Sequence, residues 1–108
     1  MVELMIYIKT HEAENGSVVA MCDESLIERV LSEGEILLDI KIYSSFYKGE
    51  LVNRQRAIEI ISQRNDVYSA NIVGKESIEI ALETGIIEKD NVKKVSKVPY
   101  AHAYKVDY

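Results

Sequence analysis

The residues best placed to do chemistry lie at a predicted strand-to-helix corner. An apolar segment over residues 70–73 runs into Gly74 and Lys75, and a predicted helix follows. The backbone amides and dipole of a helix N-terminus, with a lysine beside them, can hold a phosphate. However, the corner lacks the upstream glycine of a P-loop, and Glu76 would repel an anion in the first turn. We therefore interpret the corner first as a tight strand-to-helix turn.

Asn71 is the polar residue within this apolar segment. Asparagine is disfavoured in strands, and a buried side-chain amide requires hydrogen-bond partners. Asn71 therefore either fixes a loop, which is the default role, or points into a ligand site. In the second case Asn71, Gly74 and Lys75 together would bind a small anion or a nucleotide.

A second group of candidates lies in a basic segment of an acidic chain. Residues 89–105 hold five lysines and one acid, whereas the formal net charge of the 108 residues is −5. Lysines bind phosphates and aromatic rings stack on bases, so the segment fits an edge that contacts RNA or the ribosome. It also fits a strand edge that lysines protect against aggregation. The candidate nucleic-acid contacts are Lys93, Lys94, Lys97, Tyr100 and His102.

Phe46 and Tyr47 are adjacent aromatic residues in a predicted turn. A turn normally avoids two aromatic side chains unless they fold back onto the protein as a plug or contact a partner. Both alternatives remain open from the sequence, and the two residues are candidates for an interaction site.

The sequence contains no pattern typical of a catalytic or metal site. Cys22 follows an apolar segment, and the adjacent Asp23 disfavours the thiolate that a nucleophile needs, so we expect a packing role. The two histidines, His11 and His102, are distant and lack paired carboxylates. We therefore assign no catalytic residue, no metal ligand and no cofactor, and we leave open whether the protein is an enzyme.

Length and composition are those of one globular domain covering residues 1–108. Hydrophobic residues make up 47% of the chain, enough for a core without disulfides, and the single cysteine fits a reducing compartment. The first residues carry an acid and alternate in polarity, unlike a signal peptide. No apolar run approaches the ~20 residues of a membrane helix. We expect a cytoplasmic protein without a membrane partner and leave its oligomeric state open.

Local signals in the first half of the chain predict a hairpin, a helix and a third strand. Asn15-Gly16 between apolar runs is typical of a hairpin turn. Ser25 and Glu28 match a capping box, which predicts a short helix that Gly34 ends. The predicted strands cover residues 2–11, 18–22 and 36–43, and a turn covers residues 44–50.

The second half of the chain carries clearer boundary signals. Asn53 is suited to cap a helix, and Gly85 is suited to end one. Val98-Pro99 should interrupt the last strands, because proline lacks the amide that a strand ladder needs. The predicted helices cover residues 53–65 and 75–84, and the predicted strands cover 67–73, 92–95 and 100–106.

These elements predict an α+β fold: a mixed sheet of about five strands with an N-terminal hairpin and two to three helices packed on it. Helices 53–65 and 75–84 should cover one face of a sheet that contains the hairpin and strands 36–43 and 67–73. The predicted core residues are Leu4, Ile6, Ile8, Leu26, Val30, Leu38, Ile40, Ile58, Ile61, Ile72, Ile78 and Leu82.

Five short motifs occur in order along residues 22–102: Cys22-Asp23-x-x-Leu26, Phe46-Tyr47-x-Gly49-Glu50, Ala70-Asn71-Ile72-Val73-Gly74, Gly85-Ile86 and Val98-Pro99-Tyr100-Ala101-His102. Together they resemble a small archaeal family known as domain of unknown function 424. The last motif in that family is similar to Pro-His-Ala-Gln, so this chain departs from it and has no histidine directly after its proline. The resemblance implies an archaeal cytoplasmic origin and a compact α+β fold, and it implies no activity.

Two function classes are compatible with these residues. The first, which we prefer, is a non-enzymatic interaction module of archaeal translation or RNA processing. A continuous basic surface from Arg54 and Arg56 to Lys97 would favour it. The second is an enzyme or a ligand-binding protein that uses the corner at Asn71-Gly74-Lys75 with Asp23 or His102. A phosphate held at residues 74–77 would favour that class.

Overall fold

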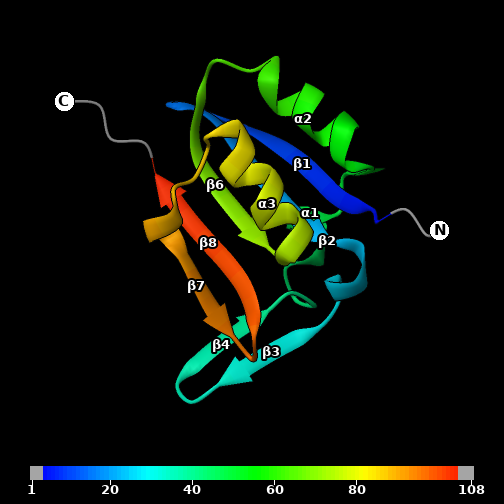
Figure 1. The fold of residues 1–108 in the computed structure, drawn as a ribbon, viewed down its shortest axis with the longest axis vertical. Coiled ribbons are helices and arrows are strands. Elements are labelled where there is room, and N and C mark those ends of the chain that lie inside the picture. The colour runs from blue at the N-terminus through cyan, green and yellow to red at the C-terminus, as the bar shows by residue number, and fades with distance from the viewer. Residues whose placement is uncertain (1–3, 105–108) are drawn as a thin grey trace.

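Six strands form one mixed sheet in the computed structural model, which describes residues 4–104. In sheet order they are β5 (Glu50–Val52), β1 (Ile6–Ala13), β2 (Gly16–Asp23), β6 (Val67–Val73), β8 (Val98–Tyr104) and β7 (Val92–Val95). β2 and β6 are parallel, and the other neighbours are antiparallel. The helices α2 (Arg54–Ser62) and α3 (Lys75–Thr84) lie side by side on one face (Figure 1). The predicted α+β fold with its N-terminal hairpin is confirmed.

The β1–β2 hairpin forms where the Asn-Gly turn predicts it, and the strands pair from Ile6–Asp23 to Ala13–Gly16. Gly16 has φ +131°, which side-chain-bearing residues rarely adopt. A Cβ there would also lie 2.1 Å from the carbonyl oxygen of Asp66. Glycine is therefore required both by the turn and by the close approach of the loop before β6.

The boundaries of α2 and α3 follow their capping residues. The Asn53 side chain accepts a hydrogen bond of 2.9 Å from the backbone amide of Arg56, which caps α2. α3 ends at Gly85, whose left-handed φ of 78° is the usual helix C-terminal conformation. Between them, β6 covers the predicted residues 67–73 and lies beside β2.

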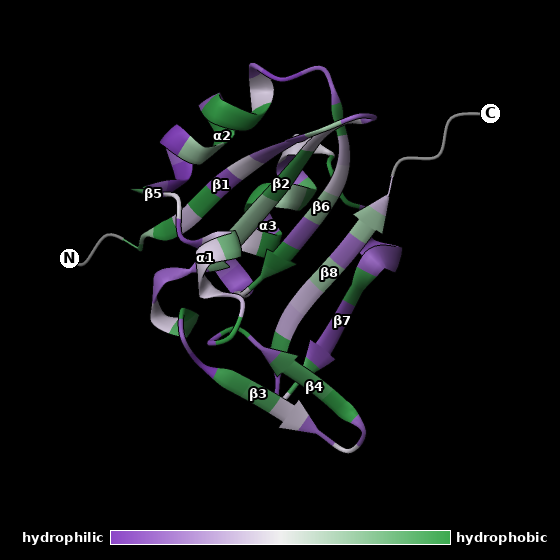
Figure 2. Cartoon of the chain, turned by 180° about the vertical axis from the view of Figure 1, so that it is seen from behind, coloured by the Kyte–Doolittle hydropathy of each residue, from purple (hydrophilic) through white to green (hydrophobic). Residues whose placement is uncertain are grey.

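The sheet carries a hydrophobic core on each face, because the central strands are apolar on both sides. α2 and α3 cover the first core, and α1 (Ser44–Tyr47) with the separate hairpin of β3 (Val30–Glu33) and β4 (Ile36–Asp39) covers part of the second (Figure 2). The strand residues of the first core are Ile6, Ile8, Val19, Met21, Val52, Ala70, Ile72 and Ala101. The second core consists of Ala20, Cys22, Leu31, Ile40, Tyr47, Val73 and Val95.

The predicted helix between Ser25 and Gly34 is wrong. Only a short 3-10 turn, Glu24–Leu26, forms there, and the chain then turns at Glu28 with φ +68° and continues as β3. Gly34 has φ +60° at the first turn position of the β3–β4 hairpin instead of capping a helix. β3 pairs with β4 from Val30–Asp39 to Glu33–Ile36, and this pairing outweighs the local capping-box signal for a helix.

The predicted strand over 36–43 is also wrong in its extent and its place. It ends at Asp39, whose side chain accepts a hydrogen bond of 2.9 Å from the Ile42 amide, and it pairs only with β3, outside the main sheet. The predicted turn over 44–50 contains α1 and the start of β5. β8 begins at Val98, so the Val98-Pro99 interruption predicted before residue 100 is wrong; the Pro99 carbonyl accepts a hydrogen bond from Gly74.

The predicted core is correct where it faces the sheet and wrong near the chain start and the β3–β4 hairpin. Ile6, Ile8, Ile40, Ile61, Ile72 and Ile78 are buried. Leu26, Leu38, Ile58 and Leu82 are half-buried at the core margins. Leu4 and Val30 are 60% and 50% exposed, because Leu4 precedes β1 and Val30 lies on the outer side of its hairpin. Residues 2–3 and 105–106, the ends of two predicted strands, lie outside the described residues.

Candidate functional site

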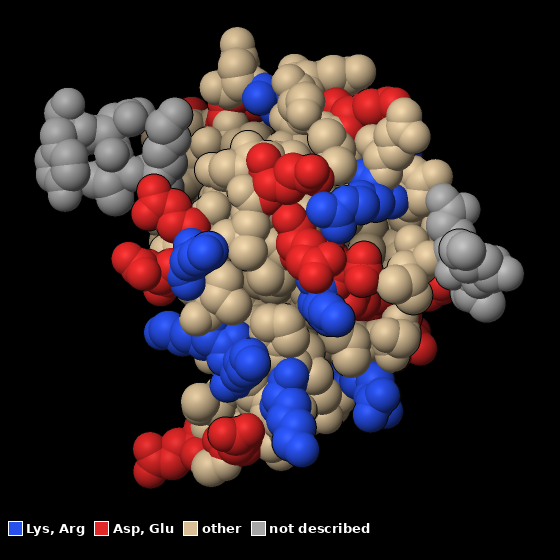
Figure 3. Space-filling model, in the orientation of Figure 1, with Lys and Arg blue, Asp and Glu red and all other residues tan. Residues whose placement is uncertain are grey.

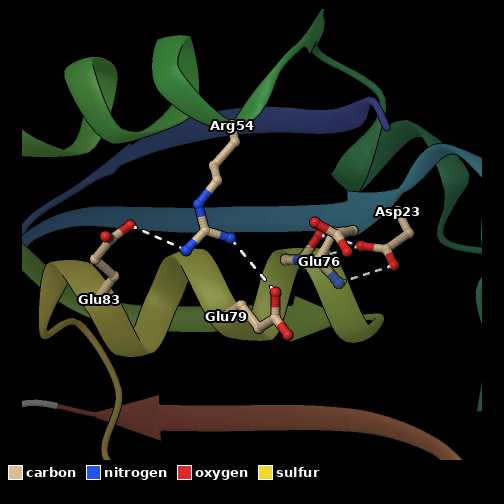
Figure 4. A network of polar contacts seen from close by, with 6 residues as sticks. Asp23, Arg54, Glu76, Glu79 and Glu83 are labelled. Atoms are coloured by element: carbon tan, nitrogen blue, oxygen red, sulfur yellow. Dashed lines mark hydrogen bonds and ion pairs between the residues drawn. The ribbon is translucent and has the colours of Figure 1, made fainter. Parts of the chain in front are cut away.

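The α3 corner holds a carboxylate of the chain itself. The two Asp23 carboxylate oxygens accept hydrogen bonds from the backbone amides of Glu76 (3.2 Å) and Ser77 (2.9 Å) (Figure 4). One of them also accepts from the Ser77 hydroxyl at 2.8 Å. These amides are the donors that a bound phosphate would use at a helix N-terminus. The capping group of α3 therefore comes from the end of β2.

Gly74 makes this contact possible. Its φ of 108° and ψ of 153° belong to a region that glycine alone readily adopts. A Cβ at this position would lie 2.3–2.6 Å from the carboxylate atoms of Asp23. The Gly74 amide donates a hydrogen bond of 2.8 Å to the Pro99 carbonyl. Gly74 therefore joins β2, α3 and β8 at one point, and Lys75 beside it is exposed.

Asn71 does not share the corner with Gly74 and Lys75. Ala70 and Ile72 belong to the core under α2 and α3, so the alternation of β6 turns Asn71 toward the opposite face. There its cross-strand partners are Ala20 on β2 and His102 on β8. The half-buried Asn71 side chain thus joins the residues of the other candidate group.

The sheet face opposite α2 and α3 is left uncovered over β6 and β8 (Figure 2). We call this region the open face, and we define it by Asn71, Lys93, Tyr100, His102 and Tyr104. The three aromatic side chains alternate along β8 and share this face. The Tyr100 and His102 rings meet edge-on with their centroids 5.9 Å apart, and Tyr104 is 73% exposed.

The three candidate lysines do not form one surface. Lys93 is the cross-strand partner of Tyr100 and lies on the open face. Lys94 follows it in β7 and therefore points to the helix side, and Lys97 lies in the β7–β8 turn. Partial burial of the His102 ring, together with the charge of Lys93, lowers the pKa of His102 below 6.5. His102 is therefore a neutral ring at neutral pH.

The basic surface is not continuous from α2 to β7. Arg54 is engaged with Glu79 at 3.4 Å and Glu83 at 3.2 Å on α3 (Figure 4). Seen from the helix side, several basic side chains lie in the lower half of the molecule, others lie higher up, and acidic side chains lie between them over the centre (Figure 3). The surface expected from Arg54 and Arg56 to Lys97 is thus interrupted by the acidic side of α3.

Phe46 and Tyr47 fold back onto the sheet. The Phe46 ring stacks on His11, with centroids 4.5 Å apart and planes 10° apart, and His11 Nε2 lies 2.9 Å from the Phe46 carbonyl oxygen. Tyr47 is buried in the second core, and burial raises its pKa to about 12. Lys9 Nζ donates a hydrogen bond to the Ser45 carbonyl. These contacts favour the plug over the partner contact for this aromatic pair.

The Cys22 thiol has the surroundings of a packing residue. Its side chain is fully buried in the second core. Burial, and secondarily the charge of Asp23, raise the pKa of Cys22 to about 12. The thiolate that nucleophilic chemistry needs is therefore strongly disfavoured.

Sequence reasoning missed a polar cluster around Arg64. Its guanidinium donates to Glu12 at 2.8 Å and to the Ser17 hydroxyl at 2.9 Å, and Ser17 in turn donates to Asp66 at 2.5 Å. These contacts fasten the end of the β1–β2 hairpin to the loop before β6. No local signal marks them, because the partners come from separate parts of the chain; the glycine at position 16 was the one hint of close approach.

Within the range 4–104, no group of histidine, cysteine, aspartate and glutamate side chains is arranged to hold a metal ion. No helix in the same range is long and apolar enough to cross a membrane.

Comparisons with known proteins identify the family. The chain resembles the crystal structure of an uncharacterized conserved protein from Methanopyrus kandleri, with 20% sequence identity, a TM-score of 0.75 and 96% of each chain covered. At that identity the likeness shows the fold alone. No curated protein matches the chain. Residues 10–106 match the family described as Protein of unknown function (DUF424). The chain therefore belongs to this family, the one that its five motifs resemble.

Proposed function

We propose that this protein is a non-enzymatic RNA-binding module of the archaeal cytoplasm, acting in translation through RNA or the ribosome. The carrying observation is the open face, where Tyr100 and His102 lie side by side next to Lys93 without a covering helix. Rings on one strand face give bases a stacking surface, and a lysine beside them neutralises a phosphate. Single-stranded RNA satisfies both groups at once.

The charge distribution supports a small contact surface. The chain is acidic overall, so nonspecific attraction of nucleic acid to the whole molecule is weak. On the open face the attraction comes from Lys93 and from stacking on the neutral His102 ring and on Tyr104. Single-stranded RNA fits this requirement better than a duplex, because its bases are free to stack on side chains.

The alternative, an anion or nucleotide at the Asn71-Gly74-Lys75 corner, has weaker support. Asp23 already accepts from the amides of Glu76 and Ser77, so an anion would have to displace it. Asn71 also faces the other side of the sheet. The corner is therefore better understood as a structural junction than as a ligand site.

A matched pair of lysine variants tests the proposal. Lys93→Gln and Lys94→Gln each remove one charge at adjacent positions of β7, yet their side chains point to opposite faces. With a labelled single-stranded oligoribonucleotide, Lys93→Gln should reduce the slope of log affinity against log salt by about 0.7. Lys94→Gln should leave the slope close to that of the parent protein. Equal slopes for all three proteins would contradict the role of the open face.

An aromatic variant tests the stacking part of the same proposal. His102→Ala removes a partly exposed ring without opening the core, and the loss of one stacked base should cost about 1–3 kcal/mol of binding free energy. The salt slope should stay unchanged at neutral pH, because the ring is neutral there. Tyr43→Ala, at an exposed tyrosine outside the open face, is the control. If the parent protein binds neither single-stranded RNA nor ribosomes at low salt, the proposed function is wrong.

A further inference from the structure

A groove lies between the β3–β4 hairpin and the strands β7 and β8, at the margin of the open face. It encloses about 230 Å³ and is lined by Ile36, Leu37, Leu38, Asn91, Lys93, Tyr100 and His102. One wall is aliphatic and comes from β4, and the other is aromatic and comes from β8. We call this cavity the hairpin groove.

Polar contacts fix the wall of the groove that β3 and β4 supply. The Ser96 amide donates a hydrogen bond of 2.8 Å to the Glu33 carboxylate, and the Ser96 hydroxyl donates one of 2.7 Å to the Ser32 carbonyl. Ser96 and Lys97 make the β7–β8 turn with φ +49° and +68°. The turn therefore clamps the hairpin beside β7, so the groove is built before any ligand arrives.

The size and lining of the groove select one kind of group. Its volume lies below the ~300 Å³ at which pockets for whole drug-sized ligands begin, so it suits a single flat ring system. The groove favours a ring that is apolar on its faces, because one wall holds leucine and isoleucine side chains and the other holds Tyr100 and His102. Lys93 adds one positive charge at the aromatic wall, which favours a ring that carries an anion close by.

We infer that the hairpin groove receives one unpaired nucleobase of single-stranded RNA, held between the β4 side chains and the Tyr100–His102 wall, with an adjacent phosphate on Lys93. This inference rests on the proposed function and names the element of RNA that the site takes. The base leaves the stack of its own strand and inserts between protein side chains.

The groove offers few groups that could distinguish one base from another. The Asn91 side-chain oxygen already accepts from the Glu88 amide at 2.8 Å, so its amide nitrogen is the group left to contact a base. An amide donor can meet an acceptor on any of the four bases. Asn91 alone therefore gives little preference among the four bases, and the aliphatic and aromatic walls hold a base largely through its faces.

Leu37→Ala and Val30→Ala provide the test. Both residues are exposed on the same hairpin, by 66% and 50%, but only Leu37 lines the groove. Each protein is titrated with two RNA-like strands of equal length, one with bases and one abasic throughout. Leu37→Ala should weaken binding of the base-bearing strand by about 5- to 30-fold, because it removes apolar contact with the base rather than a stacked ring, and leave the abasic strand unaffected. Val30→Ala should bind both strands as the parent does.

The outcomes separate the two proposals. If the parent binds neither strand, the proposed function fails and the groove assignment fails with it. A second outcome is that the parent binds RNA, that Lys93→Gln lowers the salt slope, and that Leu37→Ala still binds the base-bearing strand like the parent. In that case the open face binds RNA, but the groove holds no base. An equal loss on both strands for Leu37→Ala also overturns the inference, because the leucine would then act on the backbone or on the fold.

Discussion

Removing the Asp23 carboxylate should destabilise the protein more than its half-buried position suggests. The substitution Asp23→Ala leaves three donors without their acceptor: the amides of Glu76 and Ser77 and the Ser77 hydroxyl. The loss of a capping side chain costs about 1 kcal/mol. Ser77 is fully buried, so its unsatisfied donors add about 1–3 kcal/mol. We expect the free energy of unfolding to fall by about 2–4 kcal/mol.

Urea unfolding followed by circular dichroism measures this loss of stability. Two further variants separate the contribution of the Asp23 charge from that of the Ser77 hydroxyl. Asp23→Asn keeps the shape but loses the charge and presents an amide nitrogen to an N–H donor, so it should lose about 1–2 kcal/mol. Ser77→Ala should lose about 1 kcal/mol, and the double variant Asp23→Ala/Ser77→Ala should lose less than the sum of its parts. A loss below about 0.5 kcal/mol for Asp23→Ala, or strict additivity of the double variant, would refute the capping role.

The same variant tests the two interpretations of the α3 corner directly. In Asp23→Ala the amides of Glu76 and Ser77 are open to an external anion, as at an uncapped helix N-terminus. Sulfate added at constant ionic strength should then raise the unfolding midpoint of the variant more than that of the parent, because a ligand bound only to the folded state stabilises it. Equal shifts in the two proteins would mean that the corner has no affinity for anions even when Asp23 is absent.

Three further predictions concern other parts of the molecule. Lys97→Gly should raise the free energy of unfolding by about 1 kcal/mol in urea, because glycine relieves the left-handed backbone at φ +68°; a loss would show that the lysine side chain matters more than the strain. The pKa of Cys22 is raised to about 12, so the unfolded thiol loses its proton first and stability should fall as pH rises above 9, less steeply in Cys22→Ala. The pKa of His102 is lowered, so the unfolded state takes up the proton first and stability should fall as pH drops below about 6.5, whereas RNA affinity should rise there; His102→Gln should flatten both profiles.

Elements with a strong local signal were predictable from the sequence, and the reason is visible at each boundary. The turn at Gly16, the cap at Asn53 and the stop at Gly85 depend on the residue itself and on its immediate neighbours. The helix predicted for segment 25–34 failed because the capping box that indicated it is only a local signal. Pairing with β4, which the sequence does not display, selected the strand.

The candidate groups were predictable as residue types but not as surfaces. Lys93 and Lys94 are adjacent residues of the same type, yet Lys93 lies beside Tyr100 and Lys94 lies on the helix side. The groove was hidden from the sequence, because its aliphatic wall comes from β4, whose residues were predicted to lie in the main sheet. The capping of α3 was hidden too, since Asp23 and Ser77 meet only when β2 and β6 pair in parallel.

The segment from Asn71 to Lys75, which looks like one motif in the sequence, contributes to two separate regions of the fold. Strand alternation sends Asn71 to the open face beside His102, and the turn at Gly74 brings Asp23 to the start of α3. Packing and backbone conformation thus explain why position 74 needs glycine, without any ligand. No comparable packing reason calls for asparagine at position 71, because a half-buried amide on an uncovered sheet face is not needed to close the core. A substitution such as Asn71→Ala, which should change stability little, is therefore expected to act on RNA binding, whereas Gly74→Ala should act on stability.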